Sequence, residues 1–306
     1  MIYEIENGRA TTIESASPKS GGYYLGILSP EKASESLSYF RIPTHLYVQV
    51  TKNSATRFEA HENVDVICVP TTKLKTPTLN KPETVKFFLT KNSLLIVCME
   101  MTNLQKIFED TISMDELSFT PERFISNFFE DITHKDAEYL EKIEQEINTL
   151  EDEVLLNHQH KHLIEKIIYF RKKTSVLKHY YEQLLDILDS IEENENNLLS
   201  SHALRYFKIL DGRIDRLYHN VIQLGEYISE IREAYQSEVD INLNRTMKLF
   251  TVITAIFFPL TLVVGWYGMN LKMPEYGWNF SYPAVILASI IIVLASTWYF
   301  KKHKWF

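Results

Sequence analysis

The sequence from Leu249 to Tyr267 reads LFTVITAIFFPLTLVVGWY, and the sequence from Tyr282 to Phe300 reads YPAVILASIIIVLASTWYF. Neither stretch contains a charged residue. As a helix, each has about the length that crosses a hydrocarbon core of ~30 Å. A buried core helix is the alternative, but such helices rarely run this far without a polar face. We therefore expect two transmembrane spans, 249–267 and 282–300, joined by an external loop over 268–281.

Basic residues flank the two spans on one side. Arg245 and Lys248 precede the first span, and the basic tail 301–306 follows the second. The positive-inside rule then places both flanks in the cytoplasm. The start of the chain, MIYEIENGRA, lacks the apolar run of a secretory signal. We expect a two-span protein of the cell (inner) membrane with both termini cytoplasmic.

The charge is distributed unevenly along the chain, whose formal net charge is −8. Residues 243–306 contain one acidic and six basic residues, whereas residues 119–242 contain 25 acidic and 14 basic ones. The overall acidity argues against a nucleic acid partner, because phosphate neutralisation needs a basic surface. Two cysteines cannot form a disulfide framework. No nucleotide fingerprint or nucleophile–base pattern is present, so we do not expect an enzyme.

Residues 1–118 mix strand and helix patterns and predict a cytoplasmic α/β domain. Strands are expected where β-branched and aromatic residues concentrate, at His45–Thr51, Val64–Pro70, Val85–Thr90 and Ser93–Met99. The last two flank Lys91 and Asn92, a pair suited to a hairpin turn. Helices are expected near Pro30–Phe40 and Asn103–Asp110.

Residues 119–202 are charged and rich in leucine and isoleucine, which predicts long antiparallel helices with breaks near 157–162 and 192–197. Apolar residues then recur in alternating steps of four and three, as in a coiled coil. They are Ala203, Phe207, Leu210, Ile214, Leu217, Val221, Leu224, Ile228, Ile231 and Tyr235. No breaker follows before Pro259. We expect one stalk helix over 203–267, ~100 Å long, that continues into the first span.

The first span carries a stripe of residues spaced by three and four, and most of its members are polar or small. Its members are Asn244, Met247, Thr251, Thr254, Phe258, Thr261 and Gly265. Such a stripe predicts either a pore lining or a packing face between helices. Pro259 removes one backbone donor and favours a kink. Gly268 follows the last helical residue, where a left-handed cap would suit glycine.

A short motif follows the first span. Tyr267-Gly268-Met269-Asn270 is followed by Met273-Pro274-Glu275. Together with the two spans, the proline and the long upstream helix, this motif resembles the CorA family of divalent-cation channels, whose hallmark is Gly-Met-Asn at this place. The match of motifs is confined to about 244–306. The resemblance implies a funnel-shaped homopentamer with an α+β cytoplasmic domain, a long-helix stalk and two C-terminal transmembrane helices. It also implies Mg2+ as the usual substrate, often with Co2+ and Ni2+.

The resemblance assigns Gly268, Met269 and Asn270 to a selectivity filter. Five Asn270 carboxamides could accept hydrogen bonds from the water shell of Mg2+, which dehydrates reluctantly. The implied pore face is Asn244, Met247, Phe250 or Thr251, Thr254, Phe258, Thr261 and Gly265. The bulky Phe250 and Phe258 could form an apolar constriction, or could face lipid or another helix. The membrane potential would drive influx, since a divalent ion gains ~4.6 kcal/mol per 100 mV.

In the family, intracellular Mg2+ holds the channel closed. The acidic residues Asp211 and Asp215, with Asp65, are candidate regulatory ligands, and solvated surface acids are the alternative. Lys272 departs from the family, which often has an acid between the two motifs. This base would weaken the attraction of cations to the pore mouth, although Glu275 remains.

Two other functions stay open. A zinc or other transition-metal transporter on the same scaffold is supported by the HQHKH cluster, in which His158 and His162 would share a helix face. A membrane-anchored coiled-coil scaffold would move no ions. We expect Mg2+ as substrate and regulatory ligand, with no other cofactor. The expected partners are other copies of the chain, the lipid bilayer and divalent cations.

Overall fold

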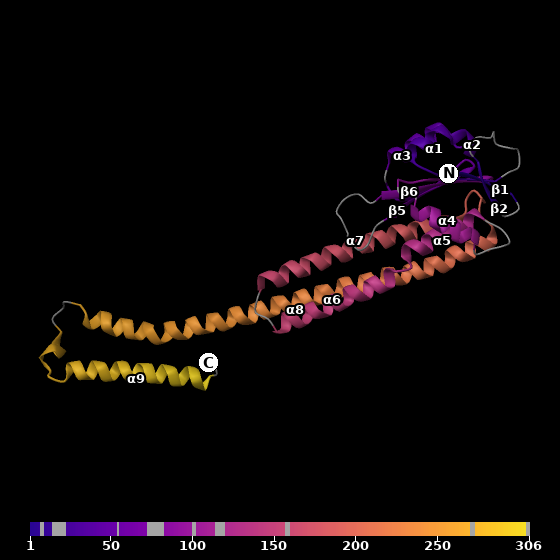
Figure 1. The fold of residues 1–306 in the computed structure, drawn as a ribbon. Coiled ribbons are helices and arrows are strands. Elements are labelled where there is room, and N and C mark those ends of the chain that lie inside the picture. Colours follow the sequence, from indigo (N-terminus) through magenta and orange to yellow (C-terminus); the bar gives the residue numbers. More distant parts are fainter. Residues whose placement is uncertain are drawn as a thin grey trace. The chain divides into compact units, whose positions relative to one another are not determined.

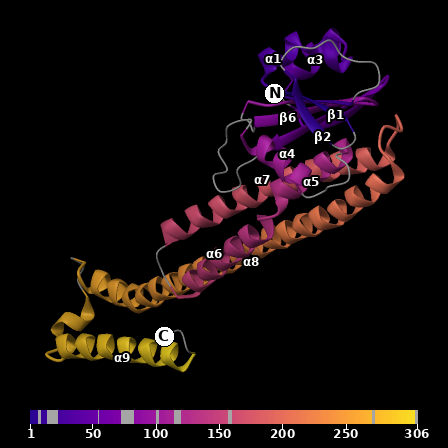
Figure 2. The same cartoon turned by 45° about the vertical axis from the view of Figure 1, so that its right-hand side comes forward.

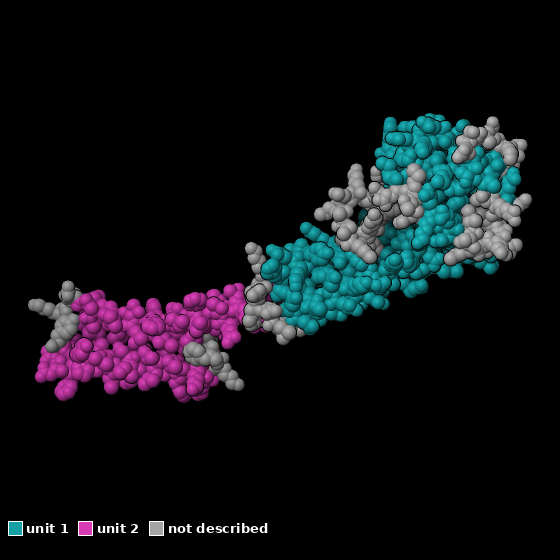
Figure 3. All heavy atoms as spheres, in the orientation of Figure 1, with its two compact units in different colours: residues 1–231 teal, residues 232–306 magenta. Residues whose placement is uncertain are grey.

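The computed structural model describes residues 1–6, 9–13, 23–53, 55–71, 83–99, 102–113, 120–156, 160–269 and 273–303. The chain forms two compact units, residues 1–231 and residues 232–306 (Figure 3). One helix, α8 (Ser201–Tyr267), begins in the first unit and ends in the second. The predicted continuity between stalk and first span is therefore confirmed at the level of secondary structure.

A mixed β-sheet forms the centre of the N-terminal part of the first unit. Within the described residues it has seven strands, in the order β2-β1-β3-β7-β6-β5-β4. Strands β3 and β7 pair in parallel, and the other neighbours pair antiparallel. The strands are β1 (Ile2–Glu6), β2 (Arg9–Ile13), β3 (Tyr23–Leu28), β4 (Arg57–His61), β5 (Val64–Thr71), β6 (Glu83–Thr90) and β7 (Ser93–Val97). The predicted β6–β7 hairpin is confirmed, with Thr90 opposite Ser93.

Helices cover both faces of this sheet (Figures 1 and 2). One face carries α1 (Pro30–Glu35), α2 (Leu37–Phe40) and α3 (Thr44–Lys52). The other carries α4 (Thr102–Ser113) and α5 (Pro121–Thr133).

Two neighbouring residues of β6 contact the helix layers on opposite faces of the sheet. Phe88 belongs to the hydrophobic cluster with α1–α3, and the Phe87 ring lies 5.0 Å from that of Phe128 on α5. Consecutive strand residues point to opposite faces, so the two phenylalanines join both helix layers to one strand.

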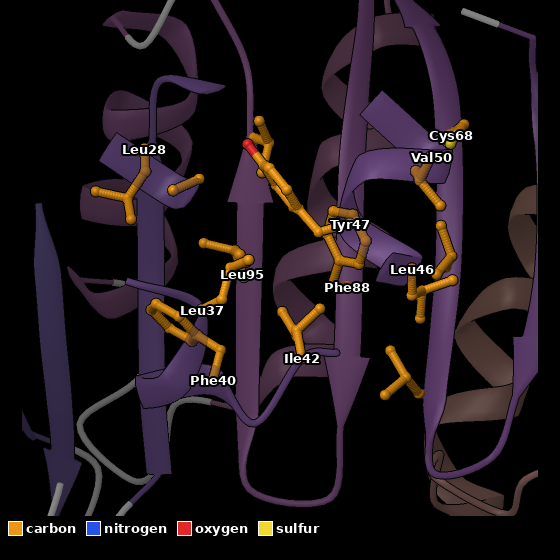
Figure 4. Close-up of a cluster of buried hydrophobic side chains, with 14 of the residues drawn as sticks. Leu28, Leu37, Phe40, Ile42, Leu46, Tyr47, Val50, Cys68, Phe88 and Leu95 are labelled. Carbon is orange, nitrogen blue, oxygen red and sulfur yellow. The ribbon is translucent and has the colours of Figure 1, made fainter. Parts of the chain in front are cut away.

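The structure corrects one predicted strand. His45–Thr51, which its β-branched and aromatic content predicts as extended, lies within helix α3. Leu46, Tyr47 and Val50 are buried on one side of this helix and point into the cluster (Figure 4). The prediction was wrong because packing of this helical face against the sheet outweighs local strand propensity.

Long helices make up the rest of the first unit. They are α6 (Asp136–Leu156), α7 (His160–Glu193) and the first part of α8. Their ends agree with the predicted breaks near 157–162 and 192–197. Every seam residue from Ala203 to Ile231 is buried, so the coiled-coil-like pattern packs as predicted. The Tyr227 hydroxyl donates to Glu151 at 2.5 Å and joins α8 to α6.

The second unit contains the end of α8, a 3-10 helix η1 (Pro274–Gly277) and α9 (Ser281–Lys302). Both α8 and α9 contain apolar windows long enough to cross a membrane, with mean hydropathy of 2.1 and 2.0. Only 6% of the first window and 0% of the second are buried. A core helix of a soluble protein would be largely buried, so we assign both segments to the membrane.

Candidate ion-conduction site

The stripe of the first span lies on an exposed side of α8. All its members are exposed in the single chain, Met247 at 57% and Phe258 at 69% among them. A different side is covered: Val252 is buried, and Ile256, Pro259 and Val263 are half-buried. At 3.6 residues per turn, the two sides are roughly 150° apart around the helix.

The covered side of α8 corresponds to a covered side of α9. The two helices lie side by side in both views (Figures 1 and 2). On α9 the half-buried positions include Val285, Ser289, Ile292 and Ser296, which recur at helical spacing. Small serines allow close approach of helices in a membrane. Packing within the chain thus uses the Val252 side and leaves the stripe available for other subunits, lipid or water.

The threonines of the stripe use their hydroxyl protons within the helix. Thr251 Oγ1 donates to the Met247 carbonyl at 2.8 Å, and Thr254 Oγ1 donates to the Phe250 carbonyl at 2.9 Å. Thr261 Oγ1 makes the same bond to the residue four positions earlier, at 2.9 Å. With its proton committed, each hydroxyl oxygen presents lone pairs outward. The threonines of the stripe therefore offer hydrogen-bond acceptors, and the stripe carries no charge.

The end of α8 is shaped by Gly268, although not as expected. Its φ does not lie in the left-handed region, so the predicted left-handed cap is wrong. Its N–H donates to the Val264 carbonyl at 2.9 Å, and a Cβ at this position would lie 2.9 Å from the same oxygen. Glycine is needed because a side chain would collide with the last turn. Met269, the second residue of the motif, is 43% exposed.

The residues that follow belong to the predicted external loop. Asn270 and Lys272 lie outside the described residues. Glu275 is exposed in η1, and its backbone carbonyl accepts bonds from the Trp278 N–H and the Ser281 hydroxyl. The backbone of this residue thus organises the start of α9.

Asp65, a candidate regulatory ligand, is buried in β5 with 2% exposure. Its Oδ1 accepts a hydrogen bond from Asn196 Nδ2 at 2.7 Å. Burial raises the pKa of this carboxyl, and the bond from Asn196 offsets only part of that effect. The environment is that of a structural acceptor within the fold.

Asp211 and Asp215 lie near each other on α8. Burial, followed by the charges of Asp189 and Asp215, raises the pKa of Asp211. Asp215 Oδ1 lies 3.3 Å from His219 Nδ1. Within the described residues of one chain, no three acidic, histidine or cysteine side chains are arranged to hold one metal ion. The structure therefore does not join Asp65 to Asp211 and Asp215 in a single site.

The histidine cluster shows little organisation where it is described. His158 lies outside the described residues. His162 is 83% exposed, and its Nδ1 lies 3.8 Å from Glu165 Oε2. This is a solvent-exposed pair at i, i+3 spacing on α7.

Residues 21–302 match the sequence family described as CorA-like Mg2+ transporter protein. The chain belongs to the CorA family. This CorA chain is 32% identical over 167 residues to the cobalt/magnesium transport protein CorA of Thermotoga maritima. The aligned region covers 54% of this chain and 47% of that protein. It is 24% identical over 307 residues to the magnesium transport protein CorA of Wolinella succinogenes, and this alignment covers 96% of this chain and 94% of that protein. It spans about half of the first relative and nearly all of the second.

The fold also matches a solved CorA structure. The complete CorA magnesium transporter from Methanocaldococcus jannaschii superposes with a TM-score of 0.76 at 17% identity, covering 100% of this chain and 99% of that one. At this identity the similarity concerns the fold, which is a mixed-sheet domain, a long helix and two apolar C-terminal helices.

One arrangement in this CorA chain escaped the sequence reasoning. Lys302 Nζ lies 5.0 Å from the centre of the Trp298 ring. The two residues are four positions apart on α9, and this spacing could have revealed the pair.

Proposed function

We propose that this CorA family member conducts Mg2+ into the cell, driven by the membrane potential, with Co2+ and Ni2+ as further substrates. The observation that carries the proposal is the uncharged stripe of α8 with its threonine acceptors, which is exposed, unused by α9 and leads directly to Gly268 and Met269. Family membership and the transport activities named for the two relatives support the same function.

We propose further that several copies, five by family resemblance, assemble with this stripe toward a common axis. Exposed apolar residues such as Phe258 would then be covered by neighbours or line a constriction. In this arrangement five Asn270 side chains form the filter, and their neutral amides act on the water shell of the ion.

We also propose that intracellular Mg2+ favours the closed state by binding between subunits at acids such as Asp211 and Asp215. Burial and the charges of neighbouring acids raise the pKa of Asp211, and a bound cation would relieve that repulsion. In the D211N/D215N variant, inhibition of influx by internal Mg2+ should require several-fold higher Mg2+ than in wild type.

The direct test is Mg2+ influx into proteoliposomes held at an inside-negative potential. Wild type should show influx that depends on the potential, and Asn270→Ala should lose most of it. Asn279→Ala is the matched control, because it changes an exposed asparagine in the same loop. Equal influx in wild type and Asn270→Ala would reject the filter. Absence of influx in wild type would reject Mg2+ conduction and lead to a series of other metals, zinc first.

Lys272 offers a second test of the pore mouth. Because a base there repels cations, Lys272→Glu should raise Mg2+ influx several-fold at low ionic strength and much less in high salt. A gain that is independent of salt would contradict an electrostatic role.

A further inference from the structure

Four basic side chains of the second unit have no ion partner among the residues that the structure describes. They are Arg245 and Lys248 on α8 and Lys301 and Lys302 on α9, and we call them the basic cluster. All four are exposed, and within the described part of the chain none forms an ion pair or hydrogen bond through its side chain. The sequence from 243 to 306 holds a single acid, Glu275, which lies at the opposite end of α9. The other acids of the unit, Glu233, Glu238 and Asp240, precede Arg245 on α8 by at least five residues, so the positive charge of residues 243–306 is not compensated within that segment.

The two halves of the basic cluster lie at the same depth. From Tyr267 back to Arg245, α8 rises about 33 Å, and from Ser281 to Lys302, α9 rises about 32 Å. The loop joins the ends at Tyr267 and Ser281, and the helices run side by side (Figures 1 and 2). Arg245, Lys248, Lys301 and Lys302 therefore reach one level of the unit, a helix length away from η1.

Aromatic rings mark this level as a membrane interface. Lys302 Nζ lies 5.0 Å from the centre of the Trp298 ring, and the Tyr299 and His303 rings lie 4.6 Å apart. Trp298 is 64% exposed and Tyr299 54% exposed. Amphipathic rings of this kind favour the headgroup region, and a lysine chain lying on the indole keeps its ammonium there.

We propose that the basic cluster binds the phosphate headgroup of an anionic membrane phospholipid. Charge complementarity carries the proposal: a phosphodiester in the same interfacial layer supplies the negative charge that residues 243–306 lack at this level, and the Trp298 N–H is an additional donor near it. The lipid would also offset positive charge near the cytoplasmic end of the conduction path, a consequence that rests on the proposed function.

Binding can be tested without any transport. The full chain, purified in neutral detergent, is titrated with phosphatidylglycerol or phosphatidylcholine, and bound lipid is counted by native mass spectrometry. We expect preferential retention of phosphatidylglycerol. The K301Q/K302Q variant should bind it about 30-fold more weakly, because each basic residue near an anionic group contributes a factor of about five.

Two further variants separate charge from structure. K301R/K302R keeps the charge and should retain the preference. K172Q/K178Q removes two exposed charges from α7 in the first unit and should bind like wild type. Equal retention of the two lipids by wild type, or undiminished phosphatidylglycerol binding by K301Q/K302Q, would overturn the proposal.

A third arm distinguishes the source of the phosphate. Inorganic phosphate at the same concentration should not displace phosphatidylglycerol, because it lacks the acyl chains held in the membrane layer. Displacement would overturn the lipid assignment in favour of a soluble anion. Failure of Mg2+ influx in the same preparation would count against the proposed conduction and leave the lipid result unaffected.

Discussion

Asn196 Nδ2 lies 2.7 Å from Asp65 Oδ1 and 2.6 Å from the His61 carbonyl oxygen, and donates to both. One side-chain amide thus ties the turn between α7 and α8 to strands β4 and β5. The contact joins residues 131 positions apart. It explains why an aspartate tolerates burial in a strand, because its carboxylate is held by a donor from another element.

Removal of this donor should destabilise the first unit. Asn196→Ala leaves the Asp65 oxygen buried without its partner, which costs about 1–3 kcal/mol. The unfolding midpoint of the variant in detergent should fall by several degrees. Asn148→Ala, on an exposed position of α6, is the control and should leave the midpoint almost unchanged. An unchanged midpoint for Asn196→Ala would show that water replaces the bond.

The buried carboxyl of Asp136 should make stability depend on pH. Burial raises its pKa to about 6, although Tyr181 donates to it at 3.0 Å and the charges of His134 and Arg213 favour the ionised form. The folded state therefore holds this proton to higher pH than the unfolded state. Stability contributed by the neutral form is present below pH ~4 and is lost as the pH rises through about 6.

Asp136→Asn removes the free-energy cost of ionising this buried carboxyl at high pH. The amide oxygen of the new side chain can still accept the hydrogen bond from the Tyr181 hydroxyl. The free energy of unfolding of the variant should exceed that of wild type by about 2–3 kcal/mol at pH 7.5, and the two should be equal near pH 4. Chemical unfolding across this pH range measures the difference. Parallel stability profiles for the two proteins would contradict the prediction.

Two glycines of the loop region form a matched pair. A Cβ at Gly268 would lie 2.9 Å from the Val264 carbonyl, whereas a Cβ at Gly277 meets nothing within 4 Å. Gly268→Ala must shift the end of α8 and with it the turn that precedes Asn270. It should reduce Mg2+ influx at least tenfold, while Gly277→Ala should change it less than twofold. The reverse order would reject the positioning role of Gly268.

Two adjacent phenylalanines test which side of α8 faces the ion path. Phe257 and Phe258 are 61% and 69% exposed and point about 100° apart. If Phe258 forms an apolar constriction, Phe258→Ala should raise influx at high internal Mg2+ several-fold, because a wider passage stays wet. Phe257→Ala, away from the stripe, should not. Equal effects of both changes would point to general loosening of the helix.

The sequence predicts the helical parts of this protein well and the sheet domain only in part. The seam from Ala203 to Ile231 is long and periodic, and one pattern determines both the helix and its buried side. His45–Thr51 is short, and its conformation depends on the sheet surface beneath it. At Gly268 the residue type was informative, but the cause is a close backbone approach and not the sign of φ.

The candidate sites follow the same division. The stripe on α8 could be predicted because its members share one helix. The roles of Asp65, Asp211 and Asp215 could not, because they depend on how strand β5, α7 and α8 come together. Asn196 donates the hydrogen bond to Asp65, and nothing in the sequence around Asn196 indicates that its partner lies in strand β5.

The hydrogen bonds of Thr251, Thr254 and Thr261 have a consequence for the sign of the ion. A hydrated cation turns its water oxygens inward and its hydrogens outward, and those hydrogens need acceptors. A hydrated chloride turns lone pairs outward and needs donors. The threonine protons already bond to carbonyls of the helix, so these hydroxyls can accept from the water shell of a cation but cannot donate to the water shell of chloride. At the level of these threonines, proton orientation would favour a hydrated cation over a hydrated anion without a charged side chain in the wall of the pore.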